Sequence, residues 1–164
     1  MIVVVADTSP LNYLVQLDSQ HLLPSLYGRV LLPRAVFREL AHPRTPAVVR
    51  TWLQSAPEWM VVKEIGSPLN PALAGLDPGE REAIQLALDE QAGLVLMDER
   101  QGVRWARQHG LAVTGTLGVL VRAAQRQLVD IDRVLAQLEL TDFRGTPELF
   151  RQARHLAQSS GSLL

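Results

Sequence analysis

Two acidic residues each follow a short apolar run in this sequence. Asp7 comes directly after residues 2–6, and Asp98 comes directly after residues 93–97. A β-branched apolar run that ends in a turn signal is typical of a buried strand. The carboxyl ends of parallel strands meet at one sheet edge, where ligands of open α/β folds bind. Asp7 and Asp98 are therefore candidates for a single site.

Two glutamates extend the apolar stripes of predicted helices. Glu80 stands three, four and seven residues before apolar side chains of the helix predicted over 78–91. Glu39 stands three and four residues after apolar side chains of the helix predicted over 33–42. A carboxylate beside a buried stripe usually needs a partner, because burying an unpaired charge is costly. Both glutamates therefore join the candidate set.

Each of the four acids also has a simpler interpretation. Asp7 is a favoured helix N-cap, and Asp98 resembles the start of a capping box with a glutamine three residues later. Glu80 falls in a first helical turn, where the helix dipole favours an acid. Glu39 could pair with a distant arginine at the surface. The sequence leaves these alternatives open.

Several carboxylates at one sheet edge repel one another unless a cation lies among them. The candidate set contains only oxygen ligands, and the chain has no cysteine. Hard oxygen ligands suit Mg²⁺ or Mn²⁺, which bind through a few carboxylates, waters and substrate phosphates. The chemistry that this set favours is phosphodiester hydrolysis, in which a metal-activated water attacks and the metal stabilises the leaving oxygen.

The elements that would position these acids alternate between strand and helix. We expect strands at 2–6, 29–33, 59–65, 93–97 and 111–115, and helices at 9–17, 33–42, 47–56, 78–91, 99–110, 116–127, 129–140 and 146–158. This alternation predicts an α/β fold, a central parallel sheet of four to five strands covered by helices on both faces. A long proline- and glycine-rich loop is expected at 66–80.

The overall composition is that of one globular domain. The chain has 164 residues and a net charge of −1, which provides no general attraction to nucleic acid. Its start has neither a basic segment nor a small-residue cleavage site, and no apolar run approaches membrane-spanning length, so we expect a cytoplasmic protein. We expect a main domain over 1–140, completed by a C-terminal helix and a frayed tail over 141–164.

Five ordered motifs resemble those of PIN-domain proteins, in particular the branch related to VapC toxins. They are "VVVADTSPLNYL", "VLLPRAVFREL", "LDPGEREAIQLAL", "LVLMDERQGVRWARQHGL" and "VTGTLGVLVRAA". The resemblance implies a three-layer α/β/α ribonuclease that uses Mg²⁺ or Mn²⁺, with Asp7, Glu39, Glu80 and Asp98 as metal ligands and catalytic acids. Two positions depart from the pattern. Glu80 stands where many members have aspartate, and Leu96 stands where many have a hydroxyl.

Other residues near these motifs could contact RNA. Ser9, Thr114 and Thr116 could offer hydroxyls to a water or a phosphate, although turn and cap roles are the simpler interpretation. Three arginines spaced as one helical stripe, Arg100, Arg104 and Arg107, could hold an RNA backbone, although such a stripe is most often a solvated face. The resemblance also suggests a small antitoxin partner and a homodimer, to which the segments 26–33 and 46–53 would offer apolar surface.

Two other enzyme and signalling classes are excluded by named residues. A phosphatase of the haloacid dehalogenase type needs a second aspartate two residues after the first, and this chain has Ser9 there. A response-regulator receiver needs a lysine late in the domain, and the only lysine is Lys63. The remaining alternative is a PIN fold that binds RNA or an antitoxin without cleaving.

Overall fold

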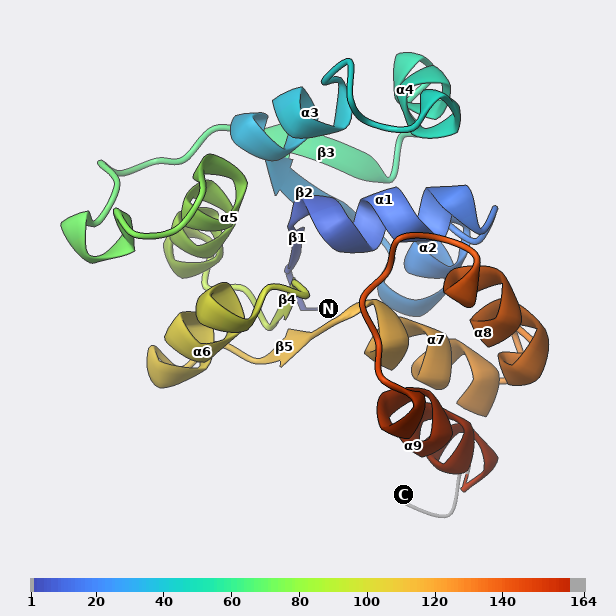
Figure 1. Ribbon diagram of the computed structural model, residues 1–164. Helices are drawn as coiled ribbons and strands as arrows, with labels where there is room; N and C mark the ends of the chain where they lie inside the picture. Colours follow the sequence, from blue (N-terminus) through green and yellow to red (C-terminus); the bar gives the residue numbers. More distant parts are fainter. Residues whose placement is uncertain (1, 160–164) are drawn as a thin grey trace.

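The computed structural model describes residues 2–159, in which five parallel strands form one sheet with helices on both faces (Figure 1). The strands are β1 (Val4–Ala6), β2 (Val30–Pro33), β3 (Met60–Lys63), β4 (Leu94–Leu96) and β5 (Val113–Thr114). The predicted three-layer α/β/α architecture and the predicted parallel sheet are confirmed.

Nine α-helices and one 3₁₀ turn connect and cover these strands within residues 2–159. They are α1 (Thr8–Gln16), α2 (Leu22–Tyr27), α3 (Arg34–Leu40), α4 (Ala47–Gln54), the 3₁₀ turn η1 (Pro71–Leu73), α5 (Pro78–Asp89), α6 (Arg100–Gln108), α7 (Thr116–Gln125), α8 (Ile131–Glu139) and α9 (Pro147–Gln158). Among the α-helices only α2 was not predicted, and the turn η1 lies in the segment expected to be a loop. The third residue of α2 is Pro24, which a first turn accepts because N–H groups there have no intrahelical partner.

The order of the strands places β1 beside β4. The sheet runs β3-β2-β1-β4-β5, so the chain first builds outward from β1 and then returns to its other side. In the β1–β4 pair Val4 lies opposite Leu94 and Ala6 lies opposite Leu96. The backbone N–H of Asp7 donates to the carbonyl of Leu96 at 2.8 Å, which extends this ladder by one step. The reversal in strand order therefore falls where Asp7 leaves the sheet.

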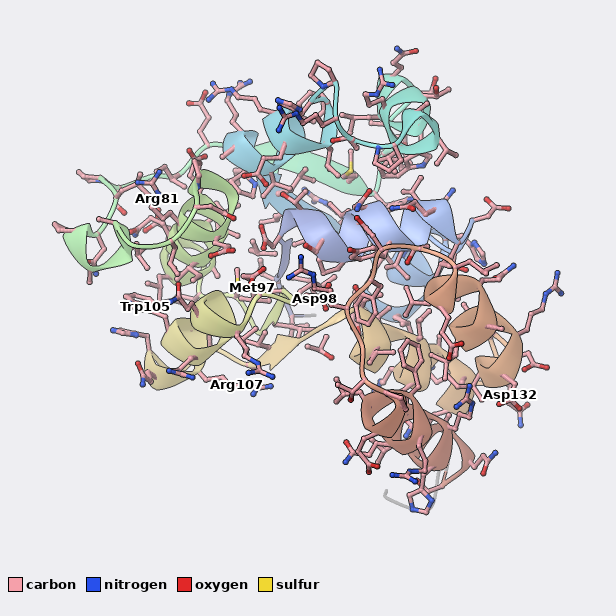
Figure 2. All side chains as sticks on the ribbon, in the orientation of Figure 1. Arg81, Met97, Asp98, Trp105, Arg107 and Asp132 are labelled. Carbon is pink, nitrogen blue, oxygen red and sulfur yellow. The ribbon has the colours of Figure 1, made fainter. Side chains whose placement is uncertain are left out.

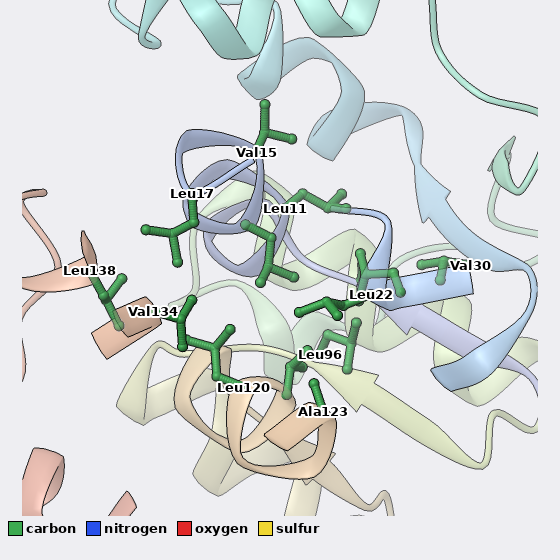
Figure 3. Close-up of a cluster of buried hydrophobic side chains, with 14 of the residues drawn as sticks. Leu11, Val15, Leu17, Leu22, Val30, Leu96, Leu120, Ala123, Val134 and Leu138 are labelled. Carbon is green, nitrogen blue, oxygen red and sulfur yellow. The ribbon is translucent and has the colours of Figure 1, made fainter. Parts of the chain in front are cut away.

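Alternate strand residues supply two separate cores. Val4 and Ala6 face a large cluster formed with α1, α2 and α7, behind which α8 and α9 pack (Figure 3). Val5 faces the opposite side, where Leu31 and Val95 join buried residues of α5 and α6. This alternation is the pleat of a β-strand, which sends successive side chains to opposite faces. A short run of apolar residues is thus buried on both sides.

The C-terminal helix shares the larger core. Phe150, Ala153 and Ala157 of α9 are buried in it, and the rings of Phe143 and Phe150 meet edge to face with centroids 6.3 Å apart. The tail predicted to be frayed lies outside the described residues beyond Ser159. None of the helices between residues 2 and 159 combines the length and apolar character that crossing a membrane requires.

One of the two segments expected to offer apolar surface for pairing is largely enclosed. Residues 30–32 are buried within the sheet, because a strand in a covered parallel sheet is enclosed on both faces. Leu26 and Tyr27 before them are half-buried. In the other segment, Val48 of α4 is 55% exposed. The most exposed large apolar side chain of the two segments is therefore on α4.

Candidate active site

Asp7 lies at the C-terminal end of β1 and is almost entirely buried, with 4% of its surface exposed. It occupies the N-cap position of α1, but within residues 2–159 its side chain makes no capping hydrogen bond, so capping does not explain this carboxylate. Burial raises the pKa of the Asp7 carboxyl to about 7, and the negative charges of Asp77, Glu39 and Asp98 add to this rise. Asp7 therefore lies within the electrostatic reach of the other acids.

Glu80 is the second buried carboxylate, with 5% of its surface exposed. The predicted helical phase is correct, because Ala83, Ile84 and Ala87 on the same side of α5 are all buried. Burial raises the pKa of Glu80 to about 8, with further contributions from Asp77, Asp7 and Glu99.

The first turn of α5 is fixed by a cap and by close packing against α6. Asp77 is the N-cap, and its carboxylate accepts a hydrogen bond from the backbone N–H of Glu80 at 3.0 Å. Pro78 occupies the first helical position, which suits its fixed φ. A side chain at Gly102 of α6 would place its Cβ 3.6 Å from Oε2 of Glu80, so the backbone of α6 runs close to this carboxylate. These contacts keep Glu80 on the inner side of α5.

Glu39 is half-buried and faces the N-terminus of α5. Its carboxylate accepts hydrogen bonds from the backbone N–H of Gly79, at 3.0 Å, and from the hydroxyl of Thr8. A Cβ at Gly79 would lie only 2.5 Å from Oε2 of Glu39, so a glycine is needed for this close approach. The carboxylate of Glu39 thus links α3 to the first turns of α1 and α5.

Asp98 follows β4 and is held at the N-terminus of α7. One carboxylate oxygen accepts from the backbone N–H of Thr116 and the other from its hydroxyl, both at 2.7 Å. Burial raises the pKa of Asp98, and the two bonds from Thr116 oppose that rise. A Cβ at Gly115 would lie 2.5 Å from Oδ1 of Asp98, so this glycine also makes room for a carboxylate. Asp98 thus accepts from the first N–H of α7, whose N-cap residue is Gly115, whereas the N-cap of α6 is Glu99.

The four acids gather around the β1–β4 switch point in two different states. Glu39 and Asp98 are tied to neighbouring helices by hydrogen bonds, whereas Asp7 and Glu80 are buried without a basic partner, since the ion pairs in residues 2–159 include none of the four. The same part of the chain contains no preformed group of three or more metal-ligating side chains. The all-carboxylate donor chemistry nevertheless fits a hard divalent cation, with Asp7 at the centre.

Three polar residues near the acids were not singled out from the sequence. Asp77 adds negative charge beside Asp7 and Glu80, and its position before a proline and a glycine is a recognisable N-cap signal. Glu99 likewise adds negative charge beside Glu80 and Asp98. The hydroxyl that reaches a candidate acid from the start of α1 is that of Thr8, while Ser9, which the sequence favoured, is half-buried beside it. Adjacent hydroxyls in one sequence cannot be distinguished without the tertiary contacts.

The residues expected to contact RNA fall into two different environments. Thr116 is completely buried and both its N–H and its hydroxyl are used on Asp98. The three arginines of α6 are exposed and, together with Asp98, line a surface depression of about 410 Å³. Figure 2 shows Asp98 at the ends of the central strands and Arg107 on α6 beside them. Thr114 is half-buried at the end of β5.

The segment between α8 and α9, residues 140–146, packs on α1. In Figure 1 it crosses in front of α1 and descends beside the junction of β5 and α7. It is anchored to α1, because Tyr13 donates to Asp142 at 2.9 Å and the Phe143 ring packs edge to face on Tyr13 with centroids 5.2 Å apart. Burial and the Asp142 bond raise the pKa of Tyr13, which the charge of Asp98 also raises and that of Arg144 lowers. Tyr13 thus lies within the electrostatic reach of both Asp98 and Arg144.

Comparison with protein families gives one match. The model of the DUF3368 family, described as a PIN domain, matches residues 3–159, which include every element from β1 to α9. Comparisons with curated proteins and with solved structures give no match. The parallel sheet, the acids at its switch point and the family match agree: the chain belongs to the PIN-domain family, whose members are generally nucleases that bind nucleic acid and use divalent metal ions.

Proposed function

We propose that this protein is a metal-dependent endoribonuclease that hydrolyses RNA phosphodiester bonds with Mg²⁺ or Mn²⁺. The observation that carries this proposal is the burial of Asp7 and Glu80 at the switch point, where the ion pairs of residues 2–159 leave both carboxylates without a basic partner. A buried carboxylate pair needs a positive charge. A divalent cation meets this need and is the catalyst that phosphodiester hydrolysis uses.

The four acids would then have different roles in binding the metal ion. Asp7 and Glu80 would bind the cation directly, and Asp98 and Glu39 would complete its surroundings from the positions that Thr116, Thr8 and Gly79 set for them. A bound metal ion would activate a water and stabilise the leaving oxygen. With raised pKa values of about 7 and 8, Asp7 is partly and Glu80 largely protonated at pH 7, so an arriving cation must displace protons.

Cleavage of single-stranded RNA by purified protein tests the proposal. We expect cleavage with Mn²⁺ or Mg²⁺, complete inhibition by EDTA, and loss of at least two orders of magnitude in Asp7→Asn. Glu58→Gln is the matched control, because Glu58 is exposed in the loop before β3 and its neutralisation should leave the rate unchanged. Cleavage that persists in EDTA or in Asp7→Asn would overturn the proposal.

A PIN fold that binds RNA or an antitoxin without cleaving is the second candidate. The observation that favours it is that Glu39 and Asp98 already have protein hydrogen-bond donors. The same assay separates the two functions, because a silent module would bind the RNA and leave it intact at every concentration of metal. RNA bound without cleavage, by protein that also binds Mn²⁺, would establish this second function.

The finer assignment is a VapC-like toxin that an antitoxin neutralises. Its support is the resemblance of the five motifs to VapC-related proteins. Expression in a bacterium should then arrest growth, and Asp7→Asn should relieve the arrest. Assembly as a homodimer through α4, where Val48 is exposed, is the corresponding structural proposal. A monomeric mass in light scattering at micromolar concentration would refute it.

A further inference from the structure

The face of α6 that looks away from the sheet is strongly basic. Arg100, Arg104 and Arg107 are exposed on it, while Gly102 and Ala106 on the inner face are buried. The three arginines line one depression together with Val103, Gln108 and Asp98. A candidate catalytic acid and a row of guanidinium groups therefore share one depression.

The spacing of the row suits phosphates of one strand. Residues at i, i+4 and i+7 lie on one side of an α-helix, and seven residues rise about 10 Å along its axis. The row is thus long enough to contact more than one phosphate of the same strand, because each guanidinium group can bind a phosphate independently.

The arginines of this row are free to bind an anion. Among residues 2–159, the ion pairs include none of the three, although several other arginines of the chain are paired. A guanidinium group binds a phosphate through two parallel hydrogen bonds. One weak contact, from Nη2 of Arg107 to the carbonyl of Val113 at 3.5 Å, inclines that side chain toward the end of β5.

The chain as a whole is not basic, so a local row of arginines is informative about where a polyanion would bind. The net charge of the chain is −1, so attraction to a polyanion must come from a local patch. Asp98, which also lines the depression, would repel a phosphate unless a cation covers it. The three arginines are therefore the groups of this depression that attract a phosphate.

We propose that the depression along α6 holds the phosphate backbone of a single RNA strand, with Arg100, Arg104 and Arg107 contacting phosphates of that strand. The proposal rests on the proposed function for the identity of the substrate. It does not require that cleavage occurs. The contacts are to the backbone, so they position a strand without selecting its sequence.

Salt-dependent binding tests the proposal without any catalytic step. Fluorescence anisotropy would follow binding of a labelled single-stranded oligoribonucleotide of mixed sequence to the full chain in EDTA, over a range of salt concentrations. Each of Arg100→Gln, Arg104→Gln and Arg107→Gln should reduce the slope of log affinity against log salt by about 0.7 for each lost phosphate contact. Each variant should also weaken the binding of two unrelated sequences by the same factor.

Arg126→Gln is the matched control. Arg126 is exposed at the C-terminal end of α7, whereas Asp98 is bound at the N-terminal end of the same helix, so the variant makes the same change in net charge far from the depression. Its slope should equal that of the unmodified protein. The melting temperatures of all four variants should be unchanged, because these side chains lie on the surface.

The outcomes separate this proposal from the proposed function. Unchanged slopes in all three α6 variants, or an equal reduction in Arg126→Gln, would overturn the assignment of the depression. Reduced slopes in a protein that never cleaves RNA would refute the nuclease and leave the binding surface established. Normal cleavage with unchanged slopes would support the nuclease and refute the binding surface along α6.

Discussion

The two pairs of acids at the switch point differ in what neutralises them. Glu39 and Asp98 accept hydrogen bonds from backbone N–H groups and hydroxyls, which hold each carboxylate at the start of a helix. Asp7 and Glu80 are more deeply buried, and burial raises the pKa of each well above its ordinary value. Burial also raises the pKa of Asp98, and its two bonds from Thr116 oppose that rise. Asp98 therefore differs from Asp7 and Glu80 in its hydrogen-bond donors and not in the direction of the pKa shift.

This difference indicates that the two pairs have different roles in a cation site. The tethered pair keeps its geometry whether or not a cation is present, because protein donors already satisfy its oxygens. The charged forms of the untethered pair, Asp7 and Glu80, remain unfavourable until a positive charge arrives. The cost of burying these two carboxylates therefore favours binding of a cation. We therefore expect substitutions in the first pair to act on stability and position, and substitutions in the second to act on metal and proton binding.

The largest expected effect is on stability and comes from Asp7. Its folded pKa of about 7 lies above the unfolded value of 3.8, so the folded state binds the proton more tightly and stability falls as pH rises from about 4 to 7. The full loss is about 4 kcal/mol on this basis. In urea unfolding in EDTA, Asp7→Asn should remove the part of the pH dependence that Asp7 contributes between about pH 4 and 7. The variant should retain the part that the raised pKa of Glu80 contributes up to about pH 8. Identical pH dependence in the variant and the unmodified protein would contradict the assignment.

Gly79→Ala should produce the next largest effect, on the tethered pair. The added Cβ would lie 2.5 Å from a carboxylate oxygen of Glu39, so that side chain must move and lose its bond to the backbone of α5. We expect a loss of about 2 kcal/mol in the free energy of unfolding. Gly75→Ala is the control, because nothing lies within 4 Å of its Cβ. Equal unfolding midpoints for the two variants would show that Glu39 does not need this approach.

Glu80→Gln should weaken Mn²⁺ binding about tenfold or more, equivalent to about 1.4 kcal/mol, because one of the two untethered charges is removed. Glu82→Gln on the same helix should leave the affinity unchanged. Glu82 accepts a hydrogen bond from the backbone N–H of Ala35 at 3.2 Å, and glutamine retains an oxygen that can accept it. Calorimetric titration with Mn²⁺ measures both. Equal losses would mean that the two glutamates serve the site together.

Thr116→Val should have the smallest effect and separates a positioning role from contact with RNA. Losing the hydroxyl bond to Asp98 should cost about 1 kcal/mol of stability. If Thr116 only positions Asp98, kcat for RNA cleavage should fall while KM is unchanged. Thr116→Ser should then restore both kcat and stability. A raised KM with normal kcat would instead restore the interpretation of Thr116 as a substrate-binding residue.

Local sequence patterns were sufficient for most of the architecture. The five strands and all helices except α2 follow from apolar runs, helical periodicity and turn residues, because these signals lie within short windows. The phase of α5 was also correct, since burial of Glu80 follows from the spacing of its apolar neighbours. Such local patterns do not reveal the partner of Glu82, because its carboxylate accepts a hydrogen bond from the backbone N–H of Ala35 at the start of α3, 47 positions away.

The sequence alone determined which residues could make a carboxylate site: acids that follow buried strands or extend buried stripes, with no cysteine to suggest another metal chemistry. Only the tertiary structure decided which of them are satisfied. Whether Asp98 accepts from the start of α6 or of α7, or whether Glu39 meets Gly79 or an arginine, depends on contacts between segments that local patterns do not specify. Burial and hydrogen bonding set the energy of a carboxylate, and both arise when distant segments pack together.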